Sequence, residues 1–189
     1  MHEFGYDRFP PCSLLSYLAG NFSDCERPIL WIGKDIWPTP FVLQQTGKNL
    51  LHRSIFISPP DKKLLAWSIE TALRSKRAAL IIAAPGKSGL ILTRRLMLCA
   101  RQGGSLGLLL VSSARLKTPS AAATRWQISP FPMPGSEACG FKLQLLKQQG
   151  FCSSVSEWVL ELSSDEYGRR SICVRVSAEQ KTARRKVAA

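Results

Sequence analysis

The chain has 189 residues, of which 45% are hydrophobic and 21% charged, as expected for one globular domain of ordinary size. Lysine and arginine total 26 against 13 aspartate and glutamate, so the formal net charge of +13 favours an anionic partner such as nucleic acid. No apolar run is long enough to span a membrane and no secretory signal is evident, so we expect a cytoplasmic protein with no membrane contact.

The first two thirds of the chain predict strands that alternate with helices. We expect residues 1–11 to be irregular. Apolar runs that are typical of strands in a parallel sheet follow at 28–32, 54–58, 78–84 and 106–111. The helices are expected at 13–19, 38–46, 61–75 and 88–102, ended in three cases by glycine. Asp61 is well placed to cap the third helix, because Asp before a first turn accepts a backbone N–H.

The last third predicts antiparallel strands. Apolar and polar residues alternate at 124–129, 141–145, 158–162 and 172–176. This period of two is typical of strands buried on one face only. The predicted fold class is therefore α/β, with a mostly parallel central sheet extended by antiparallel strands.

The six cysteines are scattered, with no Cys-x-x-Cys pair, and neither His2 nor His52 lies near a cysteine in sequence. Structural zinc sites need clustered thiolates or imidazoles, so we expect no metal. Without a secretory signal, reduced and mostly buried thiols are a better interpretation than disulfides.

Bases are concentrated in two stretches. Residues 71–136 include ten bases and no acid, and residues 168–189 include seven bases and one acid. Such runs are often only solvated surface. In the second stretch they are also candidates for phosphate contacts or for docking on an acidic partner. These candidate DNA-binding or partner-binding residues are Arg169, Arg170, Lys181, Arg184, Arg185 and Lys186.

One segment resembles a phosphate-binding loop. Residues 84–89 read Ala-Pro-Gly-Lys-Ser-Gly, between a predicted strand and a predicted helix. The phosphate-binding pattern also requires a glycine five residues before the Gly of Gly-Lys-Ser, and Ile81 stands there instead. The segment is therefore too short to cradle a phosphate.

Other signs of catalysis are weak. A nucleotidase needs an acid at the end of a neighbouring strand to hold Mg²⁺, and Asp35 is the lone acid at such a position. A Ser or Cys nucleophile needs a neighbouring base, and His52, beside Arg53, has the pattern of a surface residue. We therefore expect no catalytic residues, no cofactor and no enzyme activity. Trp37, in a predicted loop, is a candidate contact residue.

Several segments, in this order, resemble the ImuA family over residues 12–163. They are Leu30–Gly33, Leu64–Ser75, Ala79–Ile82, Thr93–Ala100, Ser120–Trp126 and Trp158–Leu162. ImuA proteins are RecA-like accessory factors of damage-induced translesion synthesis, and they also resemble the cell-division inhibitor SulA.

The resemblance implies a RecA-like α/β domain at 28–177, preceded by an N-terminal segment with a short helix at 1–27 and followed by a basic tail at 178–189. It also implies that the ATPase has been lost. The place of the Walker A Lys and Thr reads Pro-Pro-Cys-Ser at 10–13, and the Walker B acid would fall near Ala83 or Ala84. We further expect the chain to begin too late to supply the strand before that loop.

The function that the resemblance implies is a non-catalytic adaptor in the SOS response. Its expected partners are an ImuB-like relative of Y-family polymerases, an error-prone DnaE-type polymerase and RecA itself. Two alternatives stay open: a SulA-like inhibitor that binds FtsZ, and a non-specific DNA-binding module. The RecA fold assembles through an edge strand, so strand addition is a reasonable mode of docking.

Overall fold

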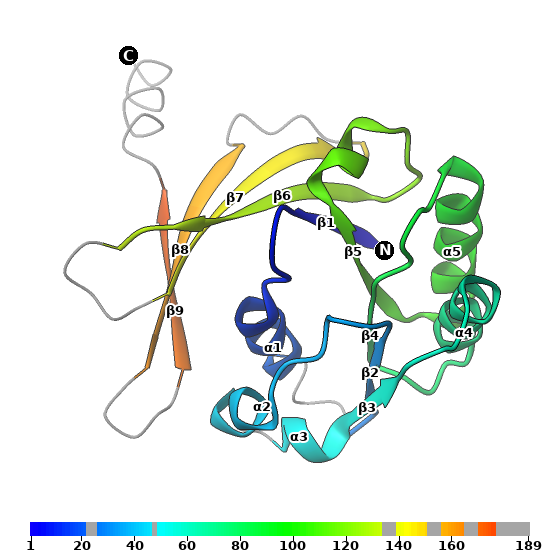
Figure 1. Ribbon diagram of the computed structural model, residues 1–189, viewed down its shortest axis with the longest axis horizontal. Helices are drawn as coiled ribbons and strands as arrows, with labels where there is room; N and C mark the ends of the chain where they lie inside the picture. The colour runs from blue at the N-terminus through cyan, green and yellow to red at the C-terminus, as the bar shows by residue number, and fades with distance from the viewer. Residues whose placement is uncertain (22–25, 47–48, 134–138, 151–155, 165–169, 177–189) are drawn as a thin grey trace.

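A nine-stranded sheet forms the centre of the protein. In the computed structural model, described for residues 1–21, 26–46, 49–133, 139–150, 156–164 and 170–176, the strand order is β3-β2-β4-β5-β1-β6-β7-β8-β9 (Figure 1). Neighbours from β3 to β6 are parallel, and neighbours from β6 to β9 are antiparallel. The predicted fold class, a parallel sheet extended by antiparallel strands, is thus confirmed.

The strands are β1 (His2–Tyr6), β2 (Ile29–Ile32), β3 (Ser54–Ile57), β4 (Leu80–Ala83), β5 (Leu106–Ser112), β6 (Thr124–Phe131), β7 (Cys139–Gln148), β8 (Glu157–Ser164) and β9 (Arg170–Val176). The helices are α1 (Cys12–Gly20), α2 (Pro40–Thr46), α3 (Leu50–Arg53), α4 (Lys62–Arg74), α5 (Leu90–Gly103) and the 3-10 helix η1 (Ser113–Lys117). Every strand and helix expected from the sequence is present, with boundaries shifted by a few residues.

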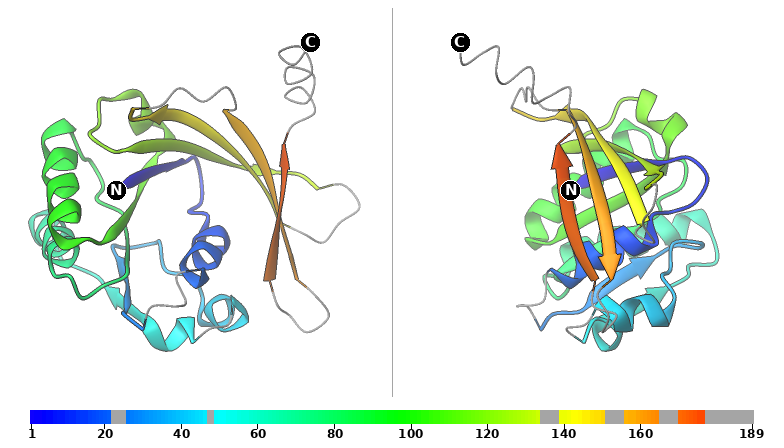
Figure 2. Two further views of the ribbon diagram at one scale, coloured as in Figure 1. Left: turned by 180° about the vertical axis from the view of Figure 1, so that it is seen from behind. Right: turned by 90° about the vertical axis from the view of Figure 1, so that its left-hand side faces the viewer.

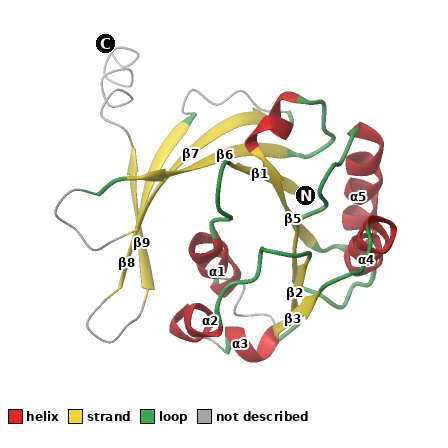
Figure 3. Cartoon of the chain, in the orientation of Figure 1, coloured by secondary structure: helices red, strands yellow, loops and turns green. Residues whose placement is uncertain are grey.

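The parallel strands are covered on both faces. Helices α1–α3 lie on one face and α4 and α5 on the other (Figure 3). The alternation along β4 shows how: Leu80 and Ile82 pack in the core on the α1 face, and Ile81 and Ala83 pack in the core on the α4 face. Burial on both faces explains why β4 is continuously apolar in sequence.

The antiparallel strands extend only one of these two cores. Ile128, Leu160 and Leu162 pack in the same cluster as Leu14 and Leu15 of α1. The sheet bends around α1, so that β8 and β9 stand across this helix from the parallel strands (Figure 2). One-sided burial is the reason for the alternating sequence pattern of this region.

Strand β1 corrects the sequence analysis. Residues 1–11 are not all irregular, and the chain does not begin too late to supply the strand that precedes α1. Instead β1 lies between β5 and β6, parallel to both, in the interior of the sheet. Its sequence, His-Glu-Phe-Gly-Tyr, is interrupted by a charged residue and so gives no continuous apolar run. Glu3 can nevertheless be buried, because it pairs with a buried base, Arg125.

None of the helices in the described part of the chain is long and apolar enough to cross a membrane.

Candidate functional site

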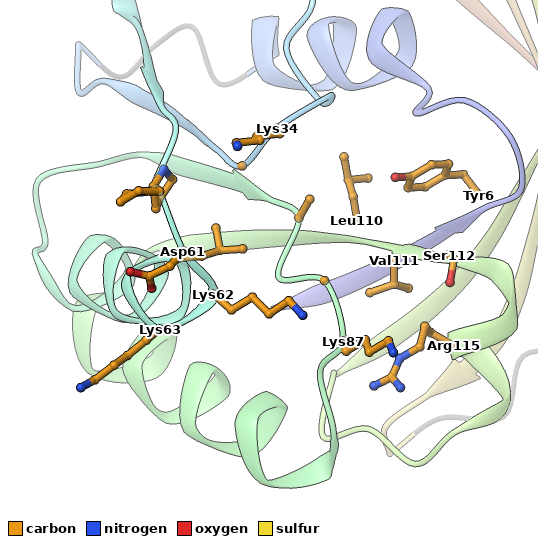
Figure 4. A pocket seen from close by; sticks show the side chains of 16 residues that line it. Tyr6, Lys34, Asp61, Lys62, Lys63, Lys87, Leu110, Val111, Ser112 and Arg115 are labelled. Carbon is orange, nitrogen blue, oxygen red and sulfur yellow. The ribbon is translucent and has the colours of Figure 1, made fainter.

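A large cavity opens where the parallel strands end. Its volume is about 1060 Å³, and it is lined from the ends of β1, β2, β4 and β5, from the segment before α4, and from η1 (Figure 4). The carboxyl ends of parallel strands share one edge of a sheet, and helices leave β1 and β3 toward opposite faces. This edge is the usual place for ligand binding in open α/β folds.

Positive side chains surround this cavity. Lys34 follows β2, Lys62 begins α4, Lys87 follows β4 and Arg115 belongs to η1. We call the cavity with these four residues the basic cleft. Lys63 also lines it, but in Figure 4 its side chain points away from the other bases.

Asp61 is the one acid among the described residues that line the basic cleft. Its Oδ1 accepts a hydrogen bond of 2.8 Å from the backbone N–H of Leu64, as the predicted helix cap requires. The carboxylate is therefore committed to the first turn of α4. No carboxylate partner of Lys34, Lys62, Lys87 or Arg115 is found in the described part of the chain.

Backbone contacts bring the loops of the basic cleft close together. Gly33 has φ +127°, and a Cβ there would lie 3.3 Å from the Cβ of Ala84. The N–H of Ala84 in turn donates to the carbonyl of Ile32 at 3.0 Å. A glycine at position 33 thus allows the segment after β2, with Lys34, to pass beside the segment after β4, with Lys87.

A second cavity, of about 640 Å³, lies along the connection from β1 to α1. This connection reads Asp-Arg-Phe-Pro-Pro at 7–11. Pro10 and Pro11 have no backbone N–H, and the N–H of Cys12 donates to the carbonyl of Pro10 at 2.8 Å. Few donors are left to face an anion at the start of α1.

Two groups at this second cavity titrate abnormally. Burial raises the pKa of the Cys12 thiol, which lies 3.6 Å from the carbonyl of Ile36. Burial also raises the pKa of Tyr6, with smaller contributions from the Asp35 carboxylate and from Cys12. Both groups are therefore neutral near pH 7, and Cys12 lacks the lowered pKa of a nucleophilic cysteine.

The segment Ser120–Trp126, part of the family resemblance, has a structural role. Arg125 forms a buried ion pair with Glu3, and Ser120 donates to the other oxygen of the same carboxylate. Thr124 bonds to the Nδ1 of His2 and accepts from the indole of Trp126, each at 2.7 Å. These side chains fasten β6 and the loop before it to β1.

Strand β3 forms one edge of the sheet, and among the described strands it pairs with β2 alone. Two of its four residues are exposed and apolar, Ile55 at 47% and Phe56 at 36%. Trp37, the contact residue proposed from the sequence, is 43% exposed and packs on Phe56 with 5.4 Å between ring centroids. An apolar, unpaired strand edge is a surface on which another chain can add a strand.

The bases expected to bind DNA or a partner are not tested by this geometry. Arg169, Lys181, Arg184, Arg185 and Lys186 lie outside the described residues. Arg170 is the first residue of β9, and only its backbone is described.

Other candidates have clear places. Lys87 lines the basic cleft, whereas Asp35 is exposed outside its lining with φ +62°. His52 is exposed on α3. Sequence reasoning missed Lys34, Lys62 and Arg115 as partners of Lys87; the available signal was that each follows a predicted parallel strand by a few residues.

Among the described residues no three His, Cys, Asp or Glu side chains are close enough to hold a metal ion. Cys12, Cys99 and Cys173 are free thiols. Cys99 is buried as expected for a core thiol, but Cys173 is exposed on β9.

Comparison with models of known protein families gives no match, and comparison with curated protein sequences gives none either. Among solved structures, the chain is similar to a protein described as the RadB recombinase. The TM-score is 0.60 at 13% sequence identity, and the match covers 86% of this chain and 87% of that one. The α/β sheet described above is therefore that of a RecA-like recombinase fold.

Proposed function

We propose that this protein is a non-catalytic adaptor in damage-induced translesion DNA synthesis. Its proposed partners are an ImuB-like relative of Y-family polymerases and, through it, an error-prone DnaE-type polymerase. The RecA-like fold, shared with a recombinase, supports a role in DNA repair or recombination. The more specific assignment to translesion synthesis rests on the sequence resemblance to the ImuA family.

The connection from β1 to α1 is the main support for proposing that the adaptor is non-catalytic. In RecA-like ATPases this connection binds phosphate through glycine N–H groups, a lysine and a threonine. Here β1 lies between β5 and β6 and leads into α1, but the connection reads Asp-Arg-Phe-Pro-Pro at 7–11, without a glycine, a lysine or a threonine. Strand β4 ends at Ala83, and Ala84 and Pro85 follow it where a magnesium-binding acid would be expected.

The edge of β3 supports the adaptor part. Its backbone N–H and C=O groups on the outer side have no strand partner in the described part of the chain. Ile55, Phe56 and Trp37 beside it provide apolar contacts for alternate side chains of an added strand. We therefore assign the docking of the protein partner to this edge.

The test is an affinity capture from DNA-damaged cells, with nuclease treatment, using three forms of the protein. The wild type is compared with Ile55→Lys, which places a charge on the β3 edge. The control is Leu98→Lys, which places a charge on the equally exposed outer face of α5. Both sites are exposed, so each substitution is expected to change the free energy of unfolding by no more than about 0.5 kcal/mol.

The expected result is capture of the Y-family relative and the DnaE-type polymerase by wild type and Leu98→Lys, and loss of both with Ile55→Lys. Capture of FtsZ instead would replace the proposal with a SulA-like division inhibitor. Nucleic acid without a protein partner would leave the DNA-binding alternative. The purified protein is also expected to show no ATP turnover, and turnover that disappears with Lys87→Ala would overturn the non-catalytic assignment.

A further inference from the structure

The basic cleft has a volume of about 1060 Å³, and the adaptor function makes no use of it. We propose that the basic cleft binds a small ligand with two or more phosphate groups, held as the metal-free anion. This inference concerns a different surface from the β3 edge and does not rest on the adaptor function.

The first argument is the convergence of charge. Lys34, Lys62, Lys87 and Arg115 come from four separate segments of the chain, and all line one cavity. In Figure 4 the side chains of Lys62, Lys87 and Arg115 extend into the same space. Like charges that converge without a carboxylate partner repel one another, and a polyanion in the cavity would remove this repulsion.

The second argument is unused hydrogen-bonding capacity. The Nε of Arg115 is buried and has no acceptor among the described residues. This nitrogen is shielded from solvent, so a ligand in the cleft would bind to the end of the guanidinium, which extends into the cleft in Figure 4.

The third argument concerns the kind of anion. The cavity volume of about 1060 Å³ is close to the range of about 300–1,000 Å³ found for small-molecule sites. Single-stranded nucleic acid is bound by exposed aromatic side chains that stack on bases, and Tyr6, partly buried, is the one aromatic residue that lines the cleft in the described part. Several cations spread around the cavity suit several phosphate groups rather than one.

The cleft has too few free carboxylates to hold a Mg²⁺ ion. Asp61 is the one acid lining the cleft in the described residues, and its carboxylate caps α4. Magnesium bound to a nucleotide is commonly held by at least one protein carboxylate. Lysine and arginine therefore take over the neutralisation of the phosphate charge, and binding should persist in EDTA.

The experiment is isothermal titration calorimetry of the full chain with inorganic tripolyphosphate, in low salt with EDTA. We expect binding of one molecule per chain. Lys62→Glu and Lys87→Glu should each weaken it about tenfold or more, because each loses a charge-assisted contact and gains a repulsion. Arg94→Glu is the control, since it makes the same charge change on the exposed face of α5, away from the cleft.

A second titration uses a single-stranded oligonucleotide of thymidine. Tripolyphosphate binding that is lost with Lys62→Glu and Lys87→Glu but kept with Arg94→Glu supports the proposal. No binding, or equal weakening by all three substitutions, overturns it. Oligonucleotide binding that depends on Lys62 and Lys87, without binding of tripolyphosphate, also overturns it and makes the cleft a nucleic-acid surface. All three substituted side chains are exposed, and an unfolding curve of each variant checks that the fold is intact.

Discussion

Arg125 of β6 donates from Nε to Oε2 of Glu3 in β1 across 2.8 Å, with side chains that are only 9% and 2% exposed. Both partners make further hydrogen bonds. The other Glu3 oxygen accepts from Ser120 at 2.7 Å. The remaining guanidinium nitrogens donate to the carbonyls of Leu116, Thr118 and Arg115 at 2.7–2.9 Å. One ion pair thus fixes β1, β6 and the η1 segment that carries Arg115 into the basic cleft.

The first prediction concerns the stability of this pair. Glu3→Leu is expected to lower the free energy of unfolding by about 3–5 kcal/mol, because it leaves the Arg125 charge buried without its carboxylate. Urea denaturation measures the effect. The control is Lys142→Ala, which breaks the partly exposed pair between Lys142 and Glu157 and should cost no more than about 1 kcal/mol. If both substitutions lowered the free energy of unfolding equally, the buried pair would stabilise the protein no more than the partly exposed pair does.

The second prediction concerns the contact between α4 and α5. A Cβ on Gly103 would collide with the backbone carbonyl of Leu73, so Gly103→Ala must push the two helices apart. We expect a loss of about 3 kcal/mol from this overpacking. Gly104→Ala is the matched comparison. Its φ of +59° is unfavourable for alanine, but its Cβ would meet nothing within 4 Å, so about 1 kcal/mol is expected. Thermal and urea unfolding should rank the two in this order.

Much of this fold could be predicted because each element has a local signal. The continuous apolar run of β4 reflects burial on two faces, and the alternation along β8 reflects burial on one. The Asp61 cap and the glycines at 103 and 104 mark helix ends, and the structure has them there. Strand β1 gave no such signal. Its burial depends on Arg125, more than a hundred residues away, and a charged residue next to His2 suggests exposure when seen alone.

The candidate site was less predictable for a related reason. The sequence alone gives no reason to group the four bases of the basic cleft, since each has the pattern of a surface residue. Only the strand order brings them to one cavity. The segment 84–89 is too short to cradle a phosphate through its backbone, but its Lys87 shares a cavity with bases from other segments, which the local sequence does not indicate. The apolar neighbours of Trp67 in the sequence favour packing in the core, but Trp67 is 60% exposed on α4.

The third prediction concerns pH. Burial, and secondarily the positive N-terminal amino group, lowers the pKa of His2 below its ordinary value. The unfolded chain therefore binds a proton at His2 more readily than the folded chain does. The fold should lose stability as the pH falls through about 6.5 toward the lowered pKa, and this loss should be absent above that range.

His2→Gln is expected to reduce this loss, which urea denaturation at about pH 7.5 and about pH 5 would measure. It removes the bond between His2 and Thr124 at both pH values, so the difference between the two pH values is the informative quantity. His52→Gln, at the exposed histidine of α3, is the control and should leave the pH dependence in place. An unchanged difference in His2→Gln would assign the acid sensitivity to other groups.

The fourth prediction separates the two roles of Asp61. Asn caps helices about as well as Asp, so Asp61→Asn should keep the stability of the protein within a few tenths of a kcal/mol, whereas Asp61→Ala should cost about 1 kcal/mol. Both substitutions remove the one acid that lines the basic cleft in the described residues. Tripolyphosphate should therefore bind both variants at least about twofold more tightly than the wild type, because an exposed charge contributes up to about 1 kcal/mol. Urea unfolding measures the stability of each variant, and calorimetry measures its affinity for tripolyphosphate. Weaker binding by Asp61→Asn would mean that the carboxylate supports the ligand, and the metal-free anion would then be the wrong form.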